Sequence, residues 1–439
     1  MAAITALVLF ASAAPSPIYP LYQQLWGFSS FTLTLIFAVY VIALLSMLLT
    51  VGSISDHIGR RPVLLAGISV LILAMVTFAF ADGVGTLMAA RVLQGIATGA
   101  ILGALSATML DLQPDEQTGA MANGAAPGIG LSSGVIVAGI FVEYVPDPRV
   151  IIYVLTAIAL AGALLVVLWL PETSPRVGFD DRRHLATTIA PRASVPSAVA
   201  PVFFAGVPVM LATWSLGGMQ LSLGSSVVAR ILGITNHAAA GAALGVFFIV
   251  AAVAAVTTSS MDPGPKRAVG LLALFVGVLT TLGGALSAST PVYLVGSGIA
   301  GIGFGTAFVA VVALLGAATP REERGRVFAA VFVGSYLGFS IPAVIAGAAT
   351  GHFGLRTTYI GYSVYVIVLV VLAAISAVLV GRRARRTPRN RDHIDEFVEP
   401  DEVAGVASCA QPIVSTTFPV AVRPSRLARA STACSRPKV

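Results

Sequence analysis

Between the apolar runs 31–52 and 62–82 the chain reads Gly52-Ser53-Ile54-Ser55-Asp56-His57-Ile58-Gly59-Arg60-Arg61-Pro62. Each run is about as long as the ~20 residues that an α-helix needs to cross a ~30 Å hydrocarbon layer. Gly59 has the backbone freedom for a tight turn, and Arg60 and Arg61 can anchor at lipid headgroups. The stretch therefore predicts two antiparallel membrane-spanning helices joined by a short charged loop.

Apolar runs of similar length fill most of the chain on both sides of this loop. Of 439 residues, 57% are hydrophobic and 10% are charged, whereas a soluble domain carries roughly a quarter charged residues. A chain of this composition cannot cover a water-facing surface, and we predict an all-α integral membrane protein with twelve transmembrane helices. The ten further runs are 2–22, 86–110, 119–142, 149–170, 201–221, 237–260, 267–288, 291–315, 327–349 and 357–380.

Three prolines, Pro15, Pro17 and Pro20, interrupt the first apolar run. An alternative interpretation of this run is a secretory signal peptide with Ala11-Ser12-Ala13 as its small-residue cleavage site. No basic residue precedes the apolar stretch, which disfavours a signal peptide. We expect the run to be the first transmembrane helix.

Basic residues are distributed unevenly between the two sides that the predicted helices define. The net charge is +7, but the basic residues lie between apolar runs and form no single face, so we expect no nucleic-acid partner. One side holds only Arg149, Arg230 and Arg356. By the positive-inside rule the other side, with both termini and the central loop, faces the cytoplasm, and we expect a multi-pass protein of a bacterial inner membrane. Its basic residues are Arg60, Arg61, Arg176, Arg182, Arg183, Arg192, Lys266, Arg267, Arg321, Arg324, Arg326 and the cluster from Arg382 to Arg391.

The chain repeats itself with an offset of 206 residues, which superimposes glycines and charged loop residues. Without gaps, Gly27 falls on Gly233, Asp56 on Asp262, Arg60 on Lys266, Arg61 on Arg267, Gly95 on Gly301, Gly99 on Gly305, Pro114 on Pro320, Glu116 on Glu322 and Gly119 on Gly325. Such a repeat predicts two pseudo-symmetric six-helix bundles, related by an axis along the membrane normal, with a central cavity between them.

The repeat and the polar stretches define the expected domains. We predict an N-terminal six-helix bundle at 1–170, a cytoplasmic central loop at 171–200 and a C-terminal six-helix bundle at 201–381. The cytoplasmic tail, 382–439, has no hydrophobic period, so we expect it to be disordered. It contains both cysteines, Cys409 and Cys434, which form no disulfide framework and no metal-ligand spacing.

The stretch from Gly52 to Arg61 matches the signature loop of the major facilitator superfamily, G-x-x-x-D-x-x-G-R-R/K, at every defining position. The chain resembles this family over residues 1–381. The resemblance implies that the loop clamps the two halves on the cytoplasmic side, with Asp56 near the start of the eleventh helix. Asp111, at the end of the fourth helix, is a candidate partner for one of the loop arginines.

The second-half copy of this loop is degraded. It keeps Asp262, Lys266 and Arg267 but lacks glycines equivalent to Gly52 and Gly59. We therefore expect an asymmetric clamp.

A second motif lies in the fourth predicted helix, where Arg91-Val92-Leu93-Gln94-Gly95-Ile96-Ala97-Thr98-Gly99 resembles the family pattern R-x-x-Q-G-x-x-x-G. A charge deep in a membrane costs at least about 2.5–3.5 kcal/mol. Arg91 is therefore expected to face a cavity or a partner, or to snorkel to the nearer interface. Gly95 and Gly99 share a helix face, which favours close helix packing over direct substrate contact.

The fifth predicted helix contains Asn123-Gly124-Ala125-Ala126-Pro127-Gly128-Ile129-Gly130. It matches the family's antiporter motif, G-x-x-x-G-P-x-x-G-G, only at Pro127 and Gly130. Pro127 and Gly128 predict a helix bend, whereas the incomplete match gives antiport only partial support.

Acidic residues are confined to predicted helix ends, loops and the tail. Many proton-coupled carriers use a buried carboxylate, so coupling here would need Asp111, another helix-end acid or a relay without a carboxylate. The polar and aromatic side chains at cavity depth are Ser16, Tyr19, Gln94, Trp214, Thr306 and Tyr336. Each can instead be a packing or interfacial residue, but together they indicate a neutral, aromatic-lined pocket.

The resemblance implies a secondary active transporter, most like bacterial drug and small-solute efflux carriers. We expect alternating access, proton-coupled efflux of an amphipathic or hydrophobic solute, and a functional monomer in the bilayer, with the proton gradient as energy source and no cofactor. No metal-ligand or catalytic constellation indicates an enzyme. An uptake carrier or facilitator for a neutral solute, and a non-transporting receptor on the same fold, remain alternatives.

Overall fold

The structure is a computed structural model that describes residues 1–112, 116–172, 194–320 and 323–386, without the side chains of 51–57, 106–107, 109–112, 116–123 and 381–386. Residues Met1–Ala384 form one compact unit, and Arg385–Val439 are assigned to a second. The described part of the first unit consists of helices and their connections.

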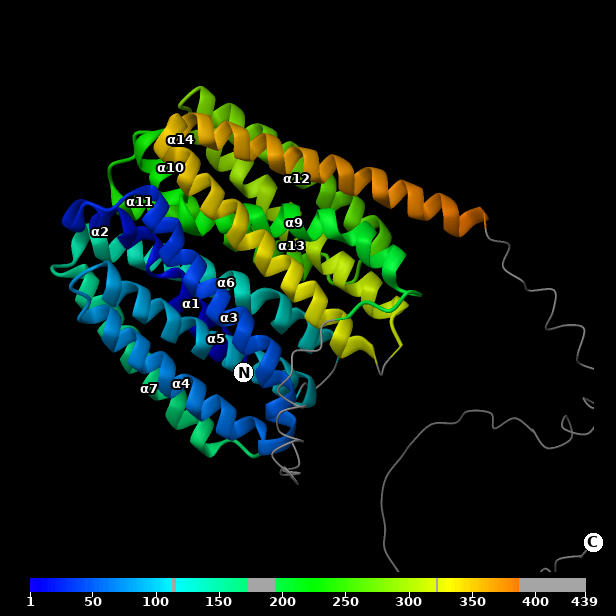
Figure 1. The fold of residues 1–439 in the computed structure, drawn as a ribbon, viewed down its shortest axis with the longest axis horizontal. Helices are drawn as coiled ribbons and strands as arrows, with labels where there is room; N and C mark the ends of the chain where they lie inside the picture. The colour runs from blue at the N-terminus through cyan, green and yellow to red at the C-terminus, as the bar shows by residue number, and fades with distance from the viewer. Residues whose placement is uncertain (113–115, 173–193, 321–322, 387–439) are drawn as a thin grey trace, which may run out of the picture. The chain divides into compact units, whose positions relative to one another are not determined.

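The helices follow one another along the chain, most of them joined by short turns (Figure 1). They are α1 (Ala2–Ala13), η1 (Ser16–Ile18), α2 (Tyr19–Trp26), α3 (Ser30–Ile58), α4 (Arg60–Ala79), α5 (Val84–Leu112), α6 (Glu116–Tyr144), α7 (Pro148–Trp169), α9 (Ala200–Ser222), α10 (Gly224–Arg230), α11 (His237–Thr257), α12 (Pro263–Leu286), α13 (Thr290–Ala318) and α14 (Arg324–Arg386).

Eleven of the described helical segments are long and apolar enough to cross a membrane. The first, Ala2–Trp26, contains α1, η1 and α2, so the prolines divide the segment without ending it. The last, Arg324–Val380, is two helices, because Gly354 leaves helical geometry with φ 77° and ψ 161°. Divided there, it provides two segments that each exceed the ~20 residues of a span. The predicted fold class, with twelve membrane-spanning helices, is confirmed.

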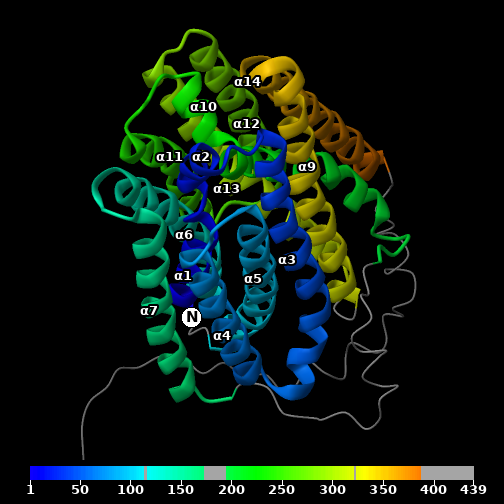
Figure 2. The same ribbon diagram turned by 60° about the vertical axis from the view of Figure 1, so that its left-hand side comes forward.

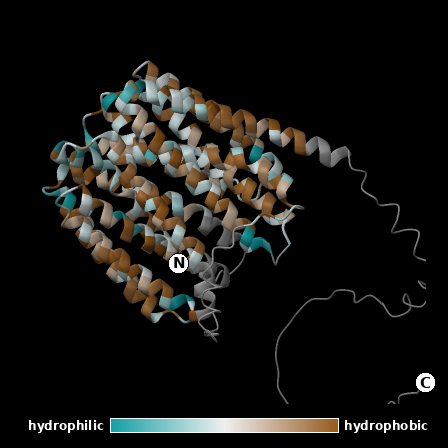
Figure 3. Cartoon of the chain, viewed as in Figure 1, coloured by the Kyte–Doolittle hydropathy of each residue, from teal (hydrophilic) through white to brown (hydrophobic). Residues whose placement is uncertain are grey.

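Large apolar side chains cover the outward faces of the helices. Trp169, Phe204 and Leu272 are 89%, 66% and 65% exposed, and Figure 3 shows hydrophobic residues along most of the described helices. A surface this apolar is unsuited to water and suited to lipid.

The charged loop is shorter than the sequence predicted. We expected a loop beginning at Gly52, which is wrong, because α3 continues to Ile58 and α4 begins at Arg60. Gly59 alone lies outside the two helices, with φ 99°, a region that favours glycine. A helix satisfies its own backbone hydrogen bonds, so it can continue past the hydrocarbon boundary that hydropathy detects.

The internal repeat is visible in the helix boundaries. Helix α5, Val84–Leu112, and helix α13, Thr290–Ala318, begin and end 206 residues apart. Gly27 and Gly233, which the same offset superimposes, both have positive φ, 65° and 70°. The repeat thus sets the positions of helices and of turns.

Packing gathers the helices into two sets. In the first, α1 lies against α5, α6 and α7, α3 and α4 pack on α5, and η1 packs on α6 (Figure 2). In the second, α9, α11 and α12 all pack on α13, α10 packs on α9 and α11, and α14 lies against α9 where Gly338 meets Leu211. The two sets meet along α6 and α11, where Gly139 and Gly241 bring the two backbones into direct contact.

Candidate transport site

Arg91 lies in the interior of the first helix set and is 1% exposed. Its guanidinium donates to Gln94 Oε1 at 2.5 Å, to the Ser12 carbonyl oxygen at 3.3 Å and to the Tyr19 hydroxyl. Gln94 in turn donates to the carbonyl oxygen of Ala11 at 2.8 Å. These bonds tie α5 to the first transmembrane segment. The arginine faces partners and does not snorkel to a lipid surface.

Three aromatic rings complete the surroundings of this guanidinium. Its central carbon lies 5.2 Å from the ring centroid of Tyr19, 5.3 Å from that of Tyr40 and 5.6 Å from that of Phe78. Each ring face attracts a cation through its quadrupole. These partners of Arg91 are all neutral, and its Nε has no hydrogen-bond partner among the described residues.

Gly95 and Gly99 pack α5 against α3. A Cβ added at Gly95 would overlap the Tyr40 carbonyl oxygen, and one at Gly99 would overlap that of Leu44. These glycines therefore serve the close approach of the two helices, and that approach places Tyr40 beside Arg91.

In the second helix set, aromatic rings surround Trp214. The Trp214 ring lies 4.6 Å from Tyr336, 5.4 Å from Phe308 and 5.8 Å from Phe339, measured between centroids. We call these four residues together with Phe37 and Tyr40 of α3 the aromatic cluster. The Trp214 Nε1 atom is buried and has no hydrogen-bond partner among the described residues, and neither does the hydroxyl of Ser335 beside Tyr336.

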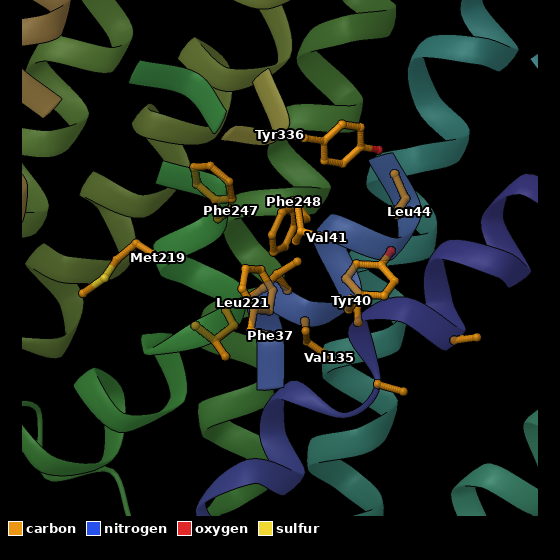
Figure 4. Packing of buried hydrophobic residues seen from close by; sticks show 14 of the residues in the cluster. Phe37, Tyr40, Val41, Leu44, Val135, Met219, Leu221, Phe247, Phe248 and Tyr336 are labelled. Carbon is orange, nitrogen blue, oxygen red and sulfur yellow. The ribbon is translucent and has the colours of Figure 1, made fainter. Parts of the chain in front are cut away.

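The aromatic cluster joins the two helix sets. Phe37 of α3 lies 5.1 Å from Phe339 of α14, measured between ring centroids. Figure 4 shows Phe37 and Tyr40 in the same packed group as Tyr336 and two phenylalanines of α11. Because the guanidinium of Arg91 lies over the ring of Tyr40, Arg91 borders the cluster directly.

Two buried hydrogen bonds connect the helix sets near one end. Ser16 Oγ donates to the Leu221 carbonyl oxygen at 2.7 Å, and Ser225 Oγ donates to the Ser16 carbonyl oxygen at 3.1 Å. We call this end, where Arg230 lies, the Arg230 end, and the opposite end the Arg61 end. We call these two hydrogen bonds the seal between the sets. The Ser16 hydroxyl is already hydrogen-bonded within it.

A carboxylate makes a second connection at the Arg230 end. Glu143, near the end of α6, accepts from the backbone N–H of His237 at 2.8 Å and lies 3.1 Å from its Nδ1. His237 is the first residue of α11, so Glu143 also meets the positive end of that helix.

A cavity of about 660 Å³ opens at the Arg230 end between the two sets. Its volume is in the range of small-molecule sites. The lining contains Arg230 and His237 and no acidic residue. The remaining lining residues are Pro17, Pro20, Gln23, Gln24, Gly27, Phe28, Ser29, Ser30, Ser225, Ser226, Ala229, Ile234, Thr235 and Ala240. We call this cavity the vestibule.

At the Arg61 end, the turn at Gly59 is tied to the end of α7. Glu172 Oε1 accepts from the backbone N–H of Arg60 at 2.8 Å, and Arg61 donates to the Leu168 carbonyl oxygen. The predicted partners Asp56 and Asp111, like Gly52, lie outside the described side chains, so their role in a clamp stays a prediction.

The other predicted gate and cavity residues of the second helix set lie in or next to α12 and α13. Asp262 precedes α12, in which Lys266 is 5% exposed and Arg267 is half-buried. Thr306 donates to its own helix at Ile302 and faces Gly270 of α12, not the aromatic cluster.

The fifth-helix motif lies at helix contacts. Pro127 is inside α6, which continues from Glu116 to Tyr144. Gly128 contacts α11 at Ala252, and Gly130 contacts α1 at Ala6.

Sequence reasoning missed several residues of this site. Phe37, Tyr40 and Phe339 lie in apolar runs in which buried and lipid-facing aromatic residues look alike. Glu143 and Glu172 were recognised only as helix-end or loop acids, because their partners are distant in sequence.

Two sets of membrane-spanning helices, related by the internal repeat, thus meet around an aromatic cluster. A family model described as "Major Facilitator Superfamily" matches residues 1–262 and again residues 202–434. The chain belongs to the major facilitator superfamily.

Individual relatives are distant. The chain is 32% identical over 124 residues to Citrate exporter 1 of Aspergillus niger, a match covering 28% of this chain and 24% of that protein. It is 32% identical over 148 residues to the puromycin resistance protein pur8 of Streptomyces alboniger, covering 33% and 29%. The chain thus matches only about a quarter to a third of the length of these curated relatives.

The same fold is found in the crystal structure of a point mutant of the nucleoside transporter NupG. It superposes with a TM-score of 0.67 and 12% identity over 85% of this chain and 98% of that one. At this identity the likeness shows the fold.

Proposed function

We propose that this transporter exports a small amphipathic or hydrophobic solute by alternating access, using the proton gradient. The observation that carries the proposal is the aromatic cluster, which joins the two helix sets and holds an indole N–H without a partner among the described residues. A buried donor without a partner costs about 1–3 kcal/mol. A solute with an apolar body and one hydrogen-bond acceptor would satisfy Trp214 Nε1 and stack on its neighbours.

Alternating access requires contacts that can break at each end in turn. At the Arg230 end, two serine hydroxyls and the Glu143–His237 contact join the sets, and Ser225 and His237 also line the vestibule. Such a small number of polar contacts suits a reversible seal. A solute released from the cluster would leave through the vestibule.

Orientation follows from the positive-inside rule. We propose that the Arg61 end and both termini face the cytoplasm of a bacterial inner membrane, so that the vestibule opens outward. Export is favoured because two relatives are named as an exporter and as a resistance protein. We propose a functional monomer, because each chain contains both helix sets.

Proton coupling requires a titrating group. Within the described spans the sequence has one acidic residue, Glu143, at the penultimate position of Gly124–Tyr144. We propose that coupling uses a helix-end acid such as Asp111, or a relay without a carboxylate, and not a carboxylate at the membrane centre.

The test is a growth-inhibition panel of amphipathic toxic compounds in bacteria with and without this chain. We expect resistance to a subset of compounds, abolished by a protonophore. Trp214→Phe should reduce the number of compounds to which the cells are resistant. Trp169 is exposed, so the matched control Trp169→Phe should leave that number unchanged. Increased sensitivity would indicate uptake. Sealed vesicles that move no solute under any gradient would indicate a non-transporting receptor.

A further inference from the structure

Charge along the proposed path is almost entirely of one sign. Among the residues of the described spans, Glu143 is the one acid, and it lies at a helix end in contact with His237. Arg91 lies well inside its span, Val84–Leu105, and is 1% exposed. A solute at the membrane centre therefore experiences a fixed cation and, within the described residues, no nearby fixed anion.

Neutral groups hold Arg91 without cancelling its charge. Its guanidinium donates to a carbonyl, an amide and a hydroxyl oxygen. Dipoles and ring faces stabilise the cation locally, but the net charge remains. In a low-dielectric interior that charge acts over longer distances than in water.

The aromatic cluster lies within reach of this field. The ring centroid of Tyr40, a member of the cluster, lies 5.3 Å from the guanidinium carbon of Arg91. Phe37, three residues earlier on α3, lies 5.1 Å from Phe339, whose ring is 5.8 Å from that of Trp214. A solute stacked on the cluster is thus separated from Arg91 by little more than one tyrosine.

The vestibule carries the same sign independently of Arg91. Arg230 and His237 are its titratable lining residues, and the rest of the described lining is neutral. Glu143, which touches His237, is outside the lining and faces the N-terminal end of α11. A leaving anion would find a cation at the exit, and a leaving cation would be repelled there.

We propose that the transported solute is an amphipathic anion, an aromatic or apolar body carrying one carboxylate or similar acidic group. This proposal rests on the proposed function, because it assumes that solute binds at the aromatic cluster. Two probes of opposite charge, placed about 10 Å from Arg91 at an effective dielectric of about 20, should differ in affinity on the order of 100-fold.

The test is binding of three fluorescent probes with one ring system to the purified full chain in detergent. Dansylglycine is an anion, dansylamide is neutral and dansylcadaverine is a cation. We expect dansylglycine to bind most tightly, on the order of 100-fold better than dansylcadaverine. Arg91→Gln should reduce that ratio to below about tenfold, whereas Arg91→Lys should largely preserve it.

Arg356→Gln is the matched control, because Arg356 donates to the Leu286 carbonyl oxygen on an exposed surface and the ratio should not change. If Arg91→Gln does not fold, the order in which the wild-type chain binds the three probes, and the ratio in Arg91→Lys, still test the anion proposal. Tighter binding of dansylcadaverine or dansylamide than of dansylglycine would overturn the anion proposal and leave the proposed function standing. Failure of all three probes to bind would count against the cluster as the solute site, and so against the proposed function.

Discussion

The two serine hydrogen bonds at the Arg230 end should set how often that end opens. Ser16 and Ser225 are 2% and 7% exposed, and their bonds measure 2.7 Å and 3.1 Å. A buried neutral hydrogen bond contributes about 1 kcal/mol net, and about 1.4 kcal/mol is tenfold in an equilibrium constant. Ser16→Ala or Ser225→Ala should therefore shift the equilibrium toward the open state roughly fivefold, and the double variant roughly thirtyfold.

A buried reporter next to the seal measures this shift. Ser222 is 3% exposed, so a cysteine there should react with a membrane-impermeant thiol reagent only when the Arg230 end opens. The background replaces Cys409 and Cys434, the two native cysteines, with serine.

The labelling rate at Ser222→Cys should rise about fivefold with each alanine, when opening is rapid relative to labelling. Ser287→Ala is the control, since that exposed hydroxyl bonds to its own helix at Gly283. Unchanged rates in the double variant would refute the seal.

Three further substitutions test other parts of the structure. Gly95→Ala should destabilise the chain by about 1–3 kcal/mol through overlap with α3, whereas Gly83→Ala, which faces open space, should not; thermal unfolding in detergent separates them. Glu143→Ala should increase the labelling rate of Ser222→Cys more than His237→Ala does, because His237→Ala keeps the hydrogen bond from the backbone N–H of residue 237 to Glu143; equal rates would contradict this. Asp56→Asn should impair transport while leaving membrane insertion intact, and normal vesicle transport by the purified variant would exclude the clamp.

The sequence was sufficient for the features that repeat or follow from hydropathy. The length of an apolar run identifies a membrane span, because the thickness of the hydrocarbon core sets the length that a span needs. The 206-residue offset gave the paired helices α5 and α13 and the paired turns at Gly27 and Gly233. The Gly59 turn was predictable because a positive φ favours one residue type.

Partners across the fold could not be predicted in the same way. The sequence left Arg91 between a cavity and a lipid surface, since the rings of Tyr40 and Phe78 approach it from other helices. Trp214 was a candidate, but its neighbours Phe308 and Phe339 come from α13 and α14. The extension of helix α3 to Ile58 was missed, because hydropathy marks the apolar part of a helix and not its end. Such contacts depend on how helices pack, which periodicity alone does not specify.

Rocking of the two helix sets can be tested most directly by locking them together at the Arg61 end. A Cβ added at Gly124 would lie 3.4 Å from the Ala255 Cβ across the α6–α11 contact, close to the ~3.5–4.5 Å of a disulfide. Gly124→Cys with Ala255→Cys, in the background without native cysteines, should transport when reduced, stop when oxidised and recover on reduction. Each single cysteine variant should be insensitive to oxidant. Full transport by a quantitatively cross-linked protein would contradict alternating access between these sets.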